Sequence, residues 1–411
     1  MSELSYLEKL LDGVEVEWKT LEDISIKISS GGTPKTGVSE FYDGDIPWLR
    51  TQEVNFCDIW DTEVKITESG VKNSSAKWIP KNCVIVAMYG ATVGKIGINK
   101  IPMTTNQACA NIQLNEEVAH YRYVFHFLCS QYTYIKSLGT GSQTNINAQI
   151  VKNIKIPIPC PDNPEKSLAI QSEIVRILDK FTELTAELTA ELNMRKKQYN
   201  YYRDQLLSFK EGEVEWKALE EVSDIYDSLH QTPQYSKNGL SMIRVTDIKN
   251  GYIDLKNTLK VNDGIFSIFT KKYLPQKNDL VMSRVGSYGN VGIIPTDNSA
   301  CMGQNTVVIH PHINNRYLFY ILTSSIGQDF IEKNVGGGSQ KTLSLKSIKS
   351  IPIPLTGESE QSKIVSILDK FDTLTNSITK GLPREIELRQ KQYEYYRDLL
   401  FSFPKPETVS N

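Results

Sequence analysis

The chain of 411 residues has no hydrophobic run near the ~20 residues that a membrane-spanning helix requires, so no membrane contact is expected. Its first residues, MSELSYLEKLLDG, lack the apolar core of a secretory signal peptide. The six cysteines include no CxxC pair. These absences, together with 23% charged and 40% hydrophobic residues, favour a folded cytoplasmic protein with free thiols.

Catalytic machinery is also missing from the sequence. HExxH, GxSxG and Asn-Pro-Pro-aromatic motifs do not occur. The segment 90–97, GATVGKIG, superficially suggests a phosphate-binding loop, but one residue too few separates its first glycine from Gly-Lys, and Ile96 stands where Ser or Thr is required. HPH at 310–312 is interpreted as part of a loop. We therefore expect neither a catalytic residue nor a bound metal.

An internal repeat organises the chain. IVRILDKF at 174–181 returns as IVSILDKF at 364–371, and RKKQYNYYRDQLLSF at 195–209 returns as RQKQYEYYRDLLFSF at 389–403. The first pair is offset by 190 residues and the second by 194, so the second helix is expected to be four residues longer than the first. EVEW and IPIP also occur twice.

Both repeated segments have the apolar spacing of long helices. Leucine, isoleucine and aromatic residues recur at three- and four-residue steps over ~40 residues. Neither helix can bury its apolar stripe alone, so we expect the two to pair antiparallel about a pseudo-twofold axis. The alternative, in which each helix packs only on its own globular unit, remains open. GLP at 381–383 is expected to kink or break the second helix.

A four-residue stutter, TELTAELTAEL, occupies residues 182–192 of the first helix. Four residues lengthen a helix by ~6 Å and turn it by only ~40° beyond a full turn. Leu184, Leu188 and Leu192 therefore stay near one face. This pattern indicates a spacer.

The sequence predicts an α+β fold with two mixed α/β globular units separated by the two long helices. The expected division is a helix tail at 1–13, a first globular unit at 14–160, a first long helix at 161–211, a second globular unit at 212–355 and a second long helix at 356–411. The two units share a frame but differ inside it, since IPWLRTQEVN in the first corresponds to SMIRVTDIKN in the second.

The charge pattern suggests binding rather than chemistry. The net charge of −2 lacks the basic excess typical of DNA-binding proteins. However, no acidic residue occurs from 69 to 115, and acid-free polar segments containing GSQ precede each IPIP, at 136–155 and 333–350. Backbone N–H groups and short polar side chains there suit phosphate and base-edge contacts, although solvated surface loops are the alternative.

Taken together, these features resemble the specificity (S) subunit of type I restriction–modification systems over essentially the whole chain. The residues that carry the resemblance are SSGGTPKTGVSEFYDGDIPWLRTQEV at 29–54, ATVGKIGI at 91–98, NQACANI at 106–112, and IPIP followed by IVxILDKF and QYxYYRDxLL. The resemblance implies that the globular units are target recognition domains, each reading half of an asymmetric, bipartite double-stranded DNA target. It also implies that the helices set the gap between the half-sites.

The resemblance further implies a non-catalytic subunit within a larger complex. Two modification subunits would dock on the helical pair and methylate adenine at N6 with S-adenosylmethionine, and restriction subunits would use ATP and Mg²⁺. No cofactor is then expected on this chain itself.

Candidate DNA-binding residues come from the glycine-turn and amide-rich loops, because Arg can pair with guanine and Asn or Gln with adenine. In the first domain they are Thr33, Lys35, Arg50, Tyr89, Thr92, Gln107, Ser142 and Gln143. In the second domain they are Gln231, Arg244, Arg284, Tyr288, Gln304, Asn305, Ser339, Gln340 and Lys341. HQTPQYSKNG at 230–239 replaces the GGTP element there, so we expect a differently built contact loop.

Two other functions remain open. A scaffold with two protein- or glycan-binding domains clamped by a helical pair explains the repeat and the near-neutral charge, but not the acid-free GSQ segments. A self-contained DNA enzyme is disfavoured by the absence of catalytic motifs.

Overall fold

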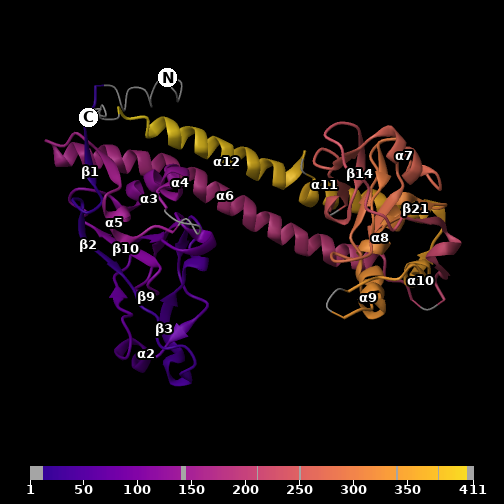
Figure 1. Ribbon diagram of the computed structural model, residues 1–411, viewed down its shortest axis with the longest axis horizontal. Coiled ribbons are helices and arrows are strands. Elements are labelled where there is room, and N and C mark those ends of the chain that lie inside the picture. The colour runs from indigo at the N-terminus through magenta and orange to yellow at the C-terminus, as the bar shows by residue number, and fades with distance from the viewer. Residues whose placement is uncertain are drawn as a thin grey trace. The chain divides into compact units, whose positions relative to one another are not determined.

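The computed structural model describes residues 13–139, 145–210, 212–249, 251–338, 341–377 and 379–404 (Figure 1). The chain forms two compact units, one of residues 1–186 and 388–411 and one of residues 187–387. Each unit contains one globular domain and parts of the helical segments. No helix among the described residues is long and apolar enough to cross a membrane. The predicted helix tail at 1–13 lies outside them except for Gly13.

Three sheets build the described part of the globular domain of the first unit. The main sheet has the order β2 (Ser25–Ser30), β10 (Cys109–Leu114), β7 (Val84–Ala87), β8 (Ile96–Asn99) and β4 (Cys57–Ile59). A second sheet has the order β5 (Lys65–Ile66), β3 (Tyr42–Leu49), β9 (Met103–Thr105) and β6 (Trp78–Ile79). The third sheet pairs β1 (Val16–Thr20) with β11 (Lys155–Pro159). The helices of this domain are α2 (Glu68–Lys72), α3 (Tyr121–Ser130), α4 (Tyr132–Ser137) and α5 (Ala148–Lys152).

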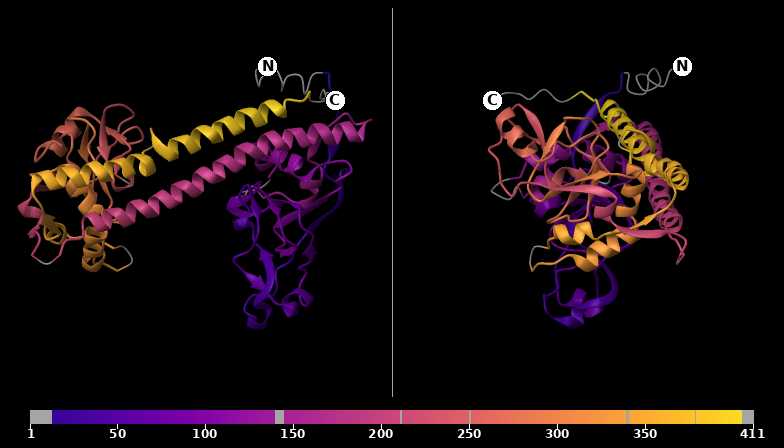
Figure 2. Two further views of the ribbon diagram at one scale, coloured as in Figure 1. Left: turned by 180° about the vertical axis from the view of Figure 1, so that it is seen from behind. Right: turned by 90° about the vertical axis from the view of Figure 1, so that its right-hand side faces the viewer.

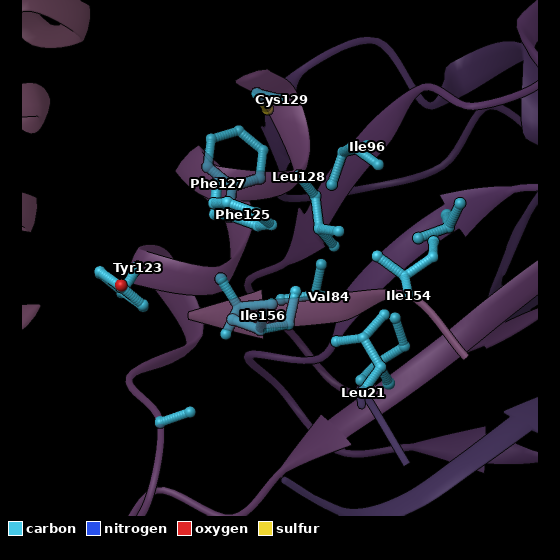
Figure 3. Close-up of a cluster of buried hydrophobic side chains, with 14 of the residues drawn as sticks. Leu21, Val84, Ile96, Tyr123, Phe125, Phe127, Leu128, Cys129, Ile154 and Ile156 are labelled. Atoms are coloured by element: carbon cyan, nitrogen blue, oxygen red, sulfur yellow. The ribbon is translucent and has the colours of Figure 1, made fainter. Parts of the chain in front are cut away.

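The core of the first domain lies between α3 and the strands. The run VIVA of β7 is buried at every position, as a continuous apolar run predicts for a central strand. Figure 3 shows Phe125, Phe127 and Leu128 of α3 close to Val84 of β7 and Ile156 of β11. The apolar face of α3 therefore fixes this helix on the sheet.

Among the described residues, the second unit repeats most of this topology, with four strands instead of five in its main sheet. Its main sheet has the order β13 (Ser223–Asp227), β21 (Thr306–Pro311), β18 (Leu280–Ser283) and β19 (Val291–Ile293). A second sheet has the order β17 (Leu259–Val261), β14 (Leu240–Ile243) and β20 (Ala300–Met302). Two smaller sheets pair β12 (Glu215–Ala218) with β22 (Pro352–Leu355), and β15 (Ile248–Lys249) with β16 (Tyr252–Ile253). Its helices are α7 (Asp263–Thr270), α8 (Asn315–Thr323), α9 (Ser325–Asn334) and α10 (Leu345–Lys349).

The duplicated IPIP sequences are the strands β11 and β22, which hold equivalent helices in place. The hydroxyl of Tyr123 in α3 donates to the carbonyl oxygen of Pro157 at 2.7 Å. The hydroxyl of Tyr317 in α8 donates to that of Pro354 at 2.8 Å. Both tyrosines are fully buried, so each hydroxyl depends on this carbonyl for its hydrogen bond. The repeat in sequence is therefore a repeat of internal contacts.

The two helical segments differ in continuity. The first is a single helix, α6 (Pro164–Leu206), of 43 residues, in which the stutter leucines Leu184, Leu188 and Leu192 are half-buried. The second consists of α11 (Glu358–Asn376) and α12 (Gly381–Leu400), separated by a break (Figure 2). The break expected at GLP therefore precedes Pro383, which lies in the first turn of α12, where a missing N–H needs no partner.

The expectation that the second helix is four residues longer is wrong. Between the repeated Phe181 and Tyr199, all residues belong to α6. Between Phe371 and Tyr393, the helical residues are 372–376 and 381–392, equal in number to 182–198. The difference of four residues equals the interval 377–380 between α11 and α12, in which residue 378 lies outside the described residues.

Aromatic stacking joins the helical segments within each unit. In the first unit, Phe181 of α6 stacks on Tyr396 of α12, with ring centroids 5.2 Å apart. In the second unit, Tyr202 of α6 stacks on Phe371 of α11, with centroids 5.6 Å apart. Earlier residues of α6 thus meet later residues of the second segment, as in an antiparallel pair. The alternative in which each helix packs only on its own globular domain is excluded by these contacts.

Replacing Gly381 by alanine should destabilise the second unit. Gly381 has φ +76°, and a Cβ there would lie 2.4 Å from the carbonyl oxygen of Thr373. We expect Gly381→Ala to lower the free energy of unfolding by about 1–3 kcal/mol. Gly336→Ala is the control, because no atom lies within 4 Å of its Cβ position and its φ lies outside the left-handed region. Chemical denaturation of both variants measures their free energies of unfolding. Equal values would contradict the requirement for glycine at position 381.

Candidate nucleic-acid interface

The loop that carries Thr33 follows β2 and is pressed against the second sheet. A Cβ on Gly31 would lie 1.8 Å from the carbonyl oxygen of Thr105. A Cβ on Gly32 would lie 2.4 Å from the carbonyl carbon of Ser75. Only glycine permits both approaches, which explains the paired glycines of GGTP.

Two aromatic side chains hold the same loop from within. The indole N–H of Trp48 donates to the carbonyl oxygen of Gly32 at 2.9 Å. The hydroxyl of Tyr42 donates to the carbonyl oxygen of Pro34 at 2.7 Å. Both aromatic residues belong to β3, so this strand fixes where the loop lies.

Three predicted residues meet at the edge of this sheet. The hydroxyl of Thr33 donates a hydrogen bond to the side-chain oxygen of Gln107. Gln107 follows β9 and Arg50 follows the parallel strand β3, where the N–H of Asn106 donates to the carbonyl oxygen of Leu49 at 2.9 Å. Carboxyl ends of parallel strands meet at one edge, so the structure brings together a first contact cluster of Thr33, Arg50 and Gln107.

The second domain contains an equivalent second contact cluster of Thr232, Arg244 and Gln304. The Thr232 hydroxyl lies 3.4 Å from the side-chain oxygen of Gln304. Arg244 and Gln304 follow the parallel strands β14 and β20, where the N–H of Gly303 donates to the carbonyl oxygen of Ile243 at 2.8 Å. Thr232 was not among the predicted residues, although the Thr-Pro dipeptide shared by the two domains was the available signal.

A carboxylate holds the arginine of each cluster. Arg50 donates to Glu63 at 2.8 Å and lies 3.5 Å from Glu53. Arg244 donates through two nitrogens to Asp247, at 3.1 and 3.0 Å. The hydrogen bond to Asp247 raises the pKa of Arg244. Each guanidinium is thereby oriented, and part of its charge is balanced before any ligand binds.

Tyr288 and Lys341 form a second group in the second domain. The hydroxyl of Tyr288 donates to Glu332 at 2.7 Å, and the ammonium of Lys341 donates to the same carboxylate at 3.1 Å. The Lys341 ammonium also lies 5.9 Å from the ring centroid of Tyr288. Hydrogen bonds from Tyr288 and then Lys341 lower the pKa of Glu332, so this carboxylate stays ionised.

Arg284 has its partners inside the domain. Its Nη1 donates to both carboxylate oxygens of Asp227, at 2.7 and 2.9 Å, and its Nε donates to the carbonyl oxygen of Leu343 at 3.1 Å. The side chain is 12% exposed. These contacts give Arg284 a structural role, and a base contact stays a prediction.

The other candidates lie apart from the two clusters or outside the described residues. Lys35 and Gln231 are exposed beside the two Thr-Pro dipeptides, and Asn305 follows Gln304 with φ +65°. Tyr89 is exposed and Thr92 half-buried in the turn after β7. Outside the described residues lie Ser142, Gln143, Ser339 and Gln340.

No metal site is formed by the part of the chain that the structure describes: it holds no group of three or more His, Cys, Asp or Glu side chains placed for an ion. The two histidines of HPH each pair with a different carboxylate. His310 lies 2.7 Å from Asp279, and His312 lies 3.0 Å from Asp224.

Comparisons with known proteins agree on one family. The chain matches the type I restriction modification DNA specificity domain twice, over residues 13–195 and 211–388. It is 41% identical to the specificity subunit of the type I restriction enzyme EcoR124I/EcoR124II from Escherichia coli, with 100% of both chains covered. It is 37% identical to the specificity subunit of EcoprrI from Escherichia coli, covering 92% of this chain and 93% of the relative.

Solved structures show the same fold. The S subunit of a type I restriction–modification system from M. genitalium aligns over 96% of this chain and 98% of its own, with a TM-score of 0.55 and 15% identity. A chain from a structure of type I R–M complex assembly and conformational transition aligns over 95% and 98%, with a TM-score of 0.58 and 15% identity.

Removing the Arg284 side chain should cost stability. It would leave the carboxylate of Asp227, 17% exposed, without its two hydrogen bonds. We expect Arg284→Ala to lower the free energy of unfolding by about 1.5–3 kcal/mol. Lys363→Ala removes an ion pair with Glu360 whose side chains are 69% and 53% exposed. This control should change the free energy of unfolding by less than about 0.5 kcal/mol. Similar losses in both variants, measured by denaturation, would argue against an internal role for Arg284.

Proposed function

The chain belongs to the family of type I restriction–modification DNA specificity subunits, and from this premise we propose that each globular domain reads one half of a bipartite, asymmetric DNA target. The observation that carries the proposal is the duplicated contact cluster. Two domains of one topology present Thr, Arg and Gln at the same edge of equivalent sheets, surrounded by different residues. A shared frame with different contents suits a protein that reads two different half-sites.

Shared and unshared residues should have different roles on DNA. Residues present in both domains cannot explain a difference between two half-sites. We assign the two contact clusters to the sugar–phosphate backbone, which both half-sites have in common. We assign base contacts to residues that differ, such as Tyr89 and Thr92 in the first domain and Tyr288 and Lys341 in the second.

The near-neutral charge is compatible with this assignment. The arginines of both clusters are oriented by carboxylates, so they add no net charge to the surface before DNA binds. DNA phosphates would compete with those carboxylates for the guanidinium groups. Binding should still weaken as salt rises, because phosphate contacts release counterions. A scaffold that binds protein or glycan would show no salt-dependent binding to double-stranded DNA.

Other subunits would complete the complex. We propose that two modification subunits carrying S-adenosylmethionine dock on the helical segments, and that restriction subunits carry ATP and Mg²⁺. Tyr201 and Tyr395 support this docking, because they occupy equivalent positions of the QYxYYRD repeat and are 61% and 57% exposed. Large exposed aromatic side chains are typical of protein interfaces.

The thiols fit the cytoplasmic location that we propose. All six cysteines are free. Burial raises the pKa of both Cys83 and Cys109 to about 12, so these thiols resist oxidation through the thiolate.

Methylome sequencing tests the recognition role. A host that carries this chain with its modification subunit is compared with a host that lacks the chain. We expect a new N6-methyladenine motif of two short half-sites separated by a fixed gap. If the complex assembles but no such motif arises, the scaffold function is favoured instead.

Deleting Thr185–Leu188 should shorten the gap. The deletion removes ~6 Å of α6, against ~3.4 Å per base pair, so we expect the gap to lose one or two base pairs. Both half-sites should stay unchanged, because no residue of either globular domain is altered. Glu187→Ala, which keeps the length of α6, is the control and should keep the original gap. An altered half-site in the deletion variant would sink the spacer hypothesis.

A further inference from the structure

A partly buried polar network joins the first globular domain to the helical segments. Nε of Arg122 in α3 donates to Asp179 of α6 at 2.7 Å, and its Nη1 donates to Asp58 of β4 at 3.0 Å. Nε2 of His126 lies 2.7 Å from the other oxygen of Asp179, and its Nδ1 lies 2.9 Å from the hydroxyl of Tyr393 in α12. His126 is fully buried. We call this network the first joint.

A second joint of the same design exists in the second unit. Nε of Arg316 in α8 donates to Asp369 of α11 at 2.9 Å, and its Nη2 donates to Asp372 at 3.0 Å. The hydroxyl of Tyr320 in α8 donates to the same oxygen of Asp369. The globular domain thus reaches the long helical segment through one arginine and one ring side chain.

The sequence encodes both joints in the same way. Asp179 and Asp369 are the aspartates of the repeated ILDKF motif. Arg122 and Arg316 are each the second residue of their helix, and the ring side chain follows one turn later in both. The two domains differ in their DNA-facing loops but keep this attachment.

A buried glutamine gives each unit a further tie. Oε1 of Gln171 in α6 accepts from the N–H of His120 at 2.9 Å, just before α3. Oε1 of Gln361 in α11 accepts from the N–H of Asn314 at 3.3 Å, just before α8. The start of each domain helix is therefore fixed to a long helix by hydrogen bonds as well as by apolar packing.

The joints have a mechanical task if the helices set the gap. A DNA site with one base pair more or less shifts a half-site by ~3.4 Å and rotates it by ~35°. A helix of fixed length rejects that site only if neither domain can tilt on its helix by this amount. Apolar packing is non-directional, whereas an Arg–carboxylate contact fixes both distance and angle.

Resting on the proposed function, we propose that the Arg122–Asp179 and Arg316–Asp369 joints restrict the complex to one gap length. These are positioning residues, which act on DNA only through the orientation of the domains. Both ion pairs are only partly buried, and a pair of this kind adds little net stability, because the cost of desolvating the charges offsets their attraction. We therefore assign them the geometry of the attachment rather than its stability.

The test uses the complex with its modification subunits and a panel of duplexes that differ only in gap length. Asp179→Asn and Asp369→Asn keep the shape of the side chain but remove the charge that holds the arginine. We expect both half-sites to be retained. The rate of methylation of duplexes one base pair off, relative to the correct gap, should rise about tenfold, equivalent to ~1.4 kcal/mol of lost discrimination.

Matched variants separate positioning from general damage. Lys152→Gln breaks the exposed 2.8 Å pair with Glu22 inside the first domain and should leave gap discrimination unchanged. Asp369→Glu keeps the charge and should restore part of the discrimination. Tyr320→Phe removes one hydroxyl. It should raise the rate of methylation of duplexes one base pair off, relative to the correct gap, roughly twofold, which is less than the effect of removing the charge.

The outcomes distinguish this proposal from the proposed function. If the Asn variants and Tyr320→Phe lose stability or total activity yet methylate only the original gap, the joints are structural and the proposal is overturned. If the unmodified complex shows no bipartite motif, the proposed function itself fails. If the Asn variants do not assemble, Tyr320→Phe alone decides the test. An unchanged rate of methylation of off-gap duplexes, relative to the correct gap, then overturns the proposal.

Discussion

The contact between a domain arginine and the ILDKF aspartate is the interaction on which the use of the long helices depends. Two recognition domains keep a fixed separation only if each holds one orientation on its helix. The hydrogen bonds from the arginine guanidinium to the aspartate fix that orientation. The arginine is the second residue of a short helix in both domains, Arg122 in α3 and Arg316 in α8. The repeat therefore preserves a mechanical connection as well as a fold.

The globular domains are also incomplete without the helical segments. Leu400, which ends α12, and Phe401, which follows it, are buried in the core of the first domain. The indole N–H of Trp18 donates to the carbonyl oxygen of Pro404 at 2.8 Å. Leu207 completes the core of the second domain in the same way. Each buried side chain of this size contributes about 1.5–3 kcal/mol, so each domain folds together with residues from the end of a helix.

Local patterns in the sequence predicted the helices and the shared frame, and the errors concern features set by distant contacts. A kink or break is expected at GLP, 381–383, but proline is tolerated in a first turn. The break lies before Gly381, whose close approach to carbonyl oxygens of α11 no local pattern reveals. Thr232 was missed because its loop lacks the glycines of GGTP. The partner of Arg284 is Asp227, 57 residues away, and no local pattern could reveal that pair.

The length of α6 and the stiffness of the joints must be considered together. A four-residue step of ~6 Å falls short of two base-pair rises, ~6.8 Å, and exceeds one, so a change in helix length never matches DNA without residual strain. Stiff joints would transfer that strain to the DNA, where deformation costs free energy and slows methylation. Loose joints would absorb it and accept several gaps. Whether a change in α6 produces a new gap or a poorer enzyme complex therefore depends on Asp179 and Asp369 as much as on the stutter itself.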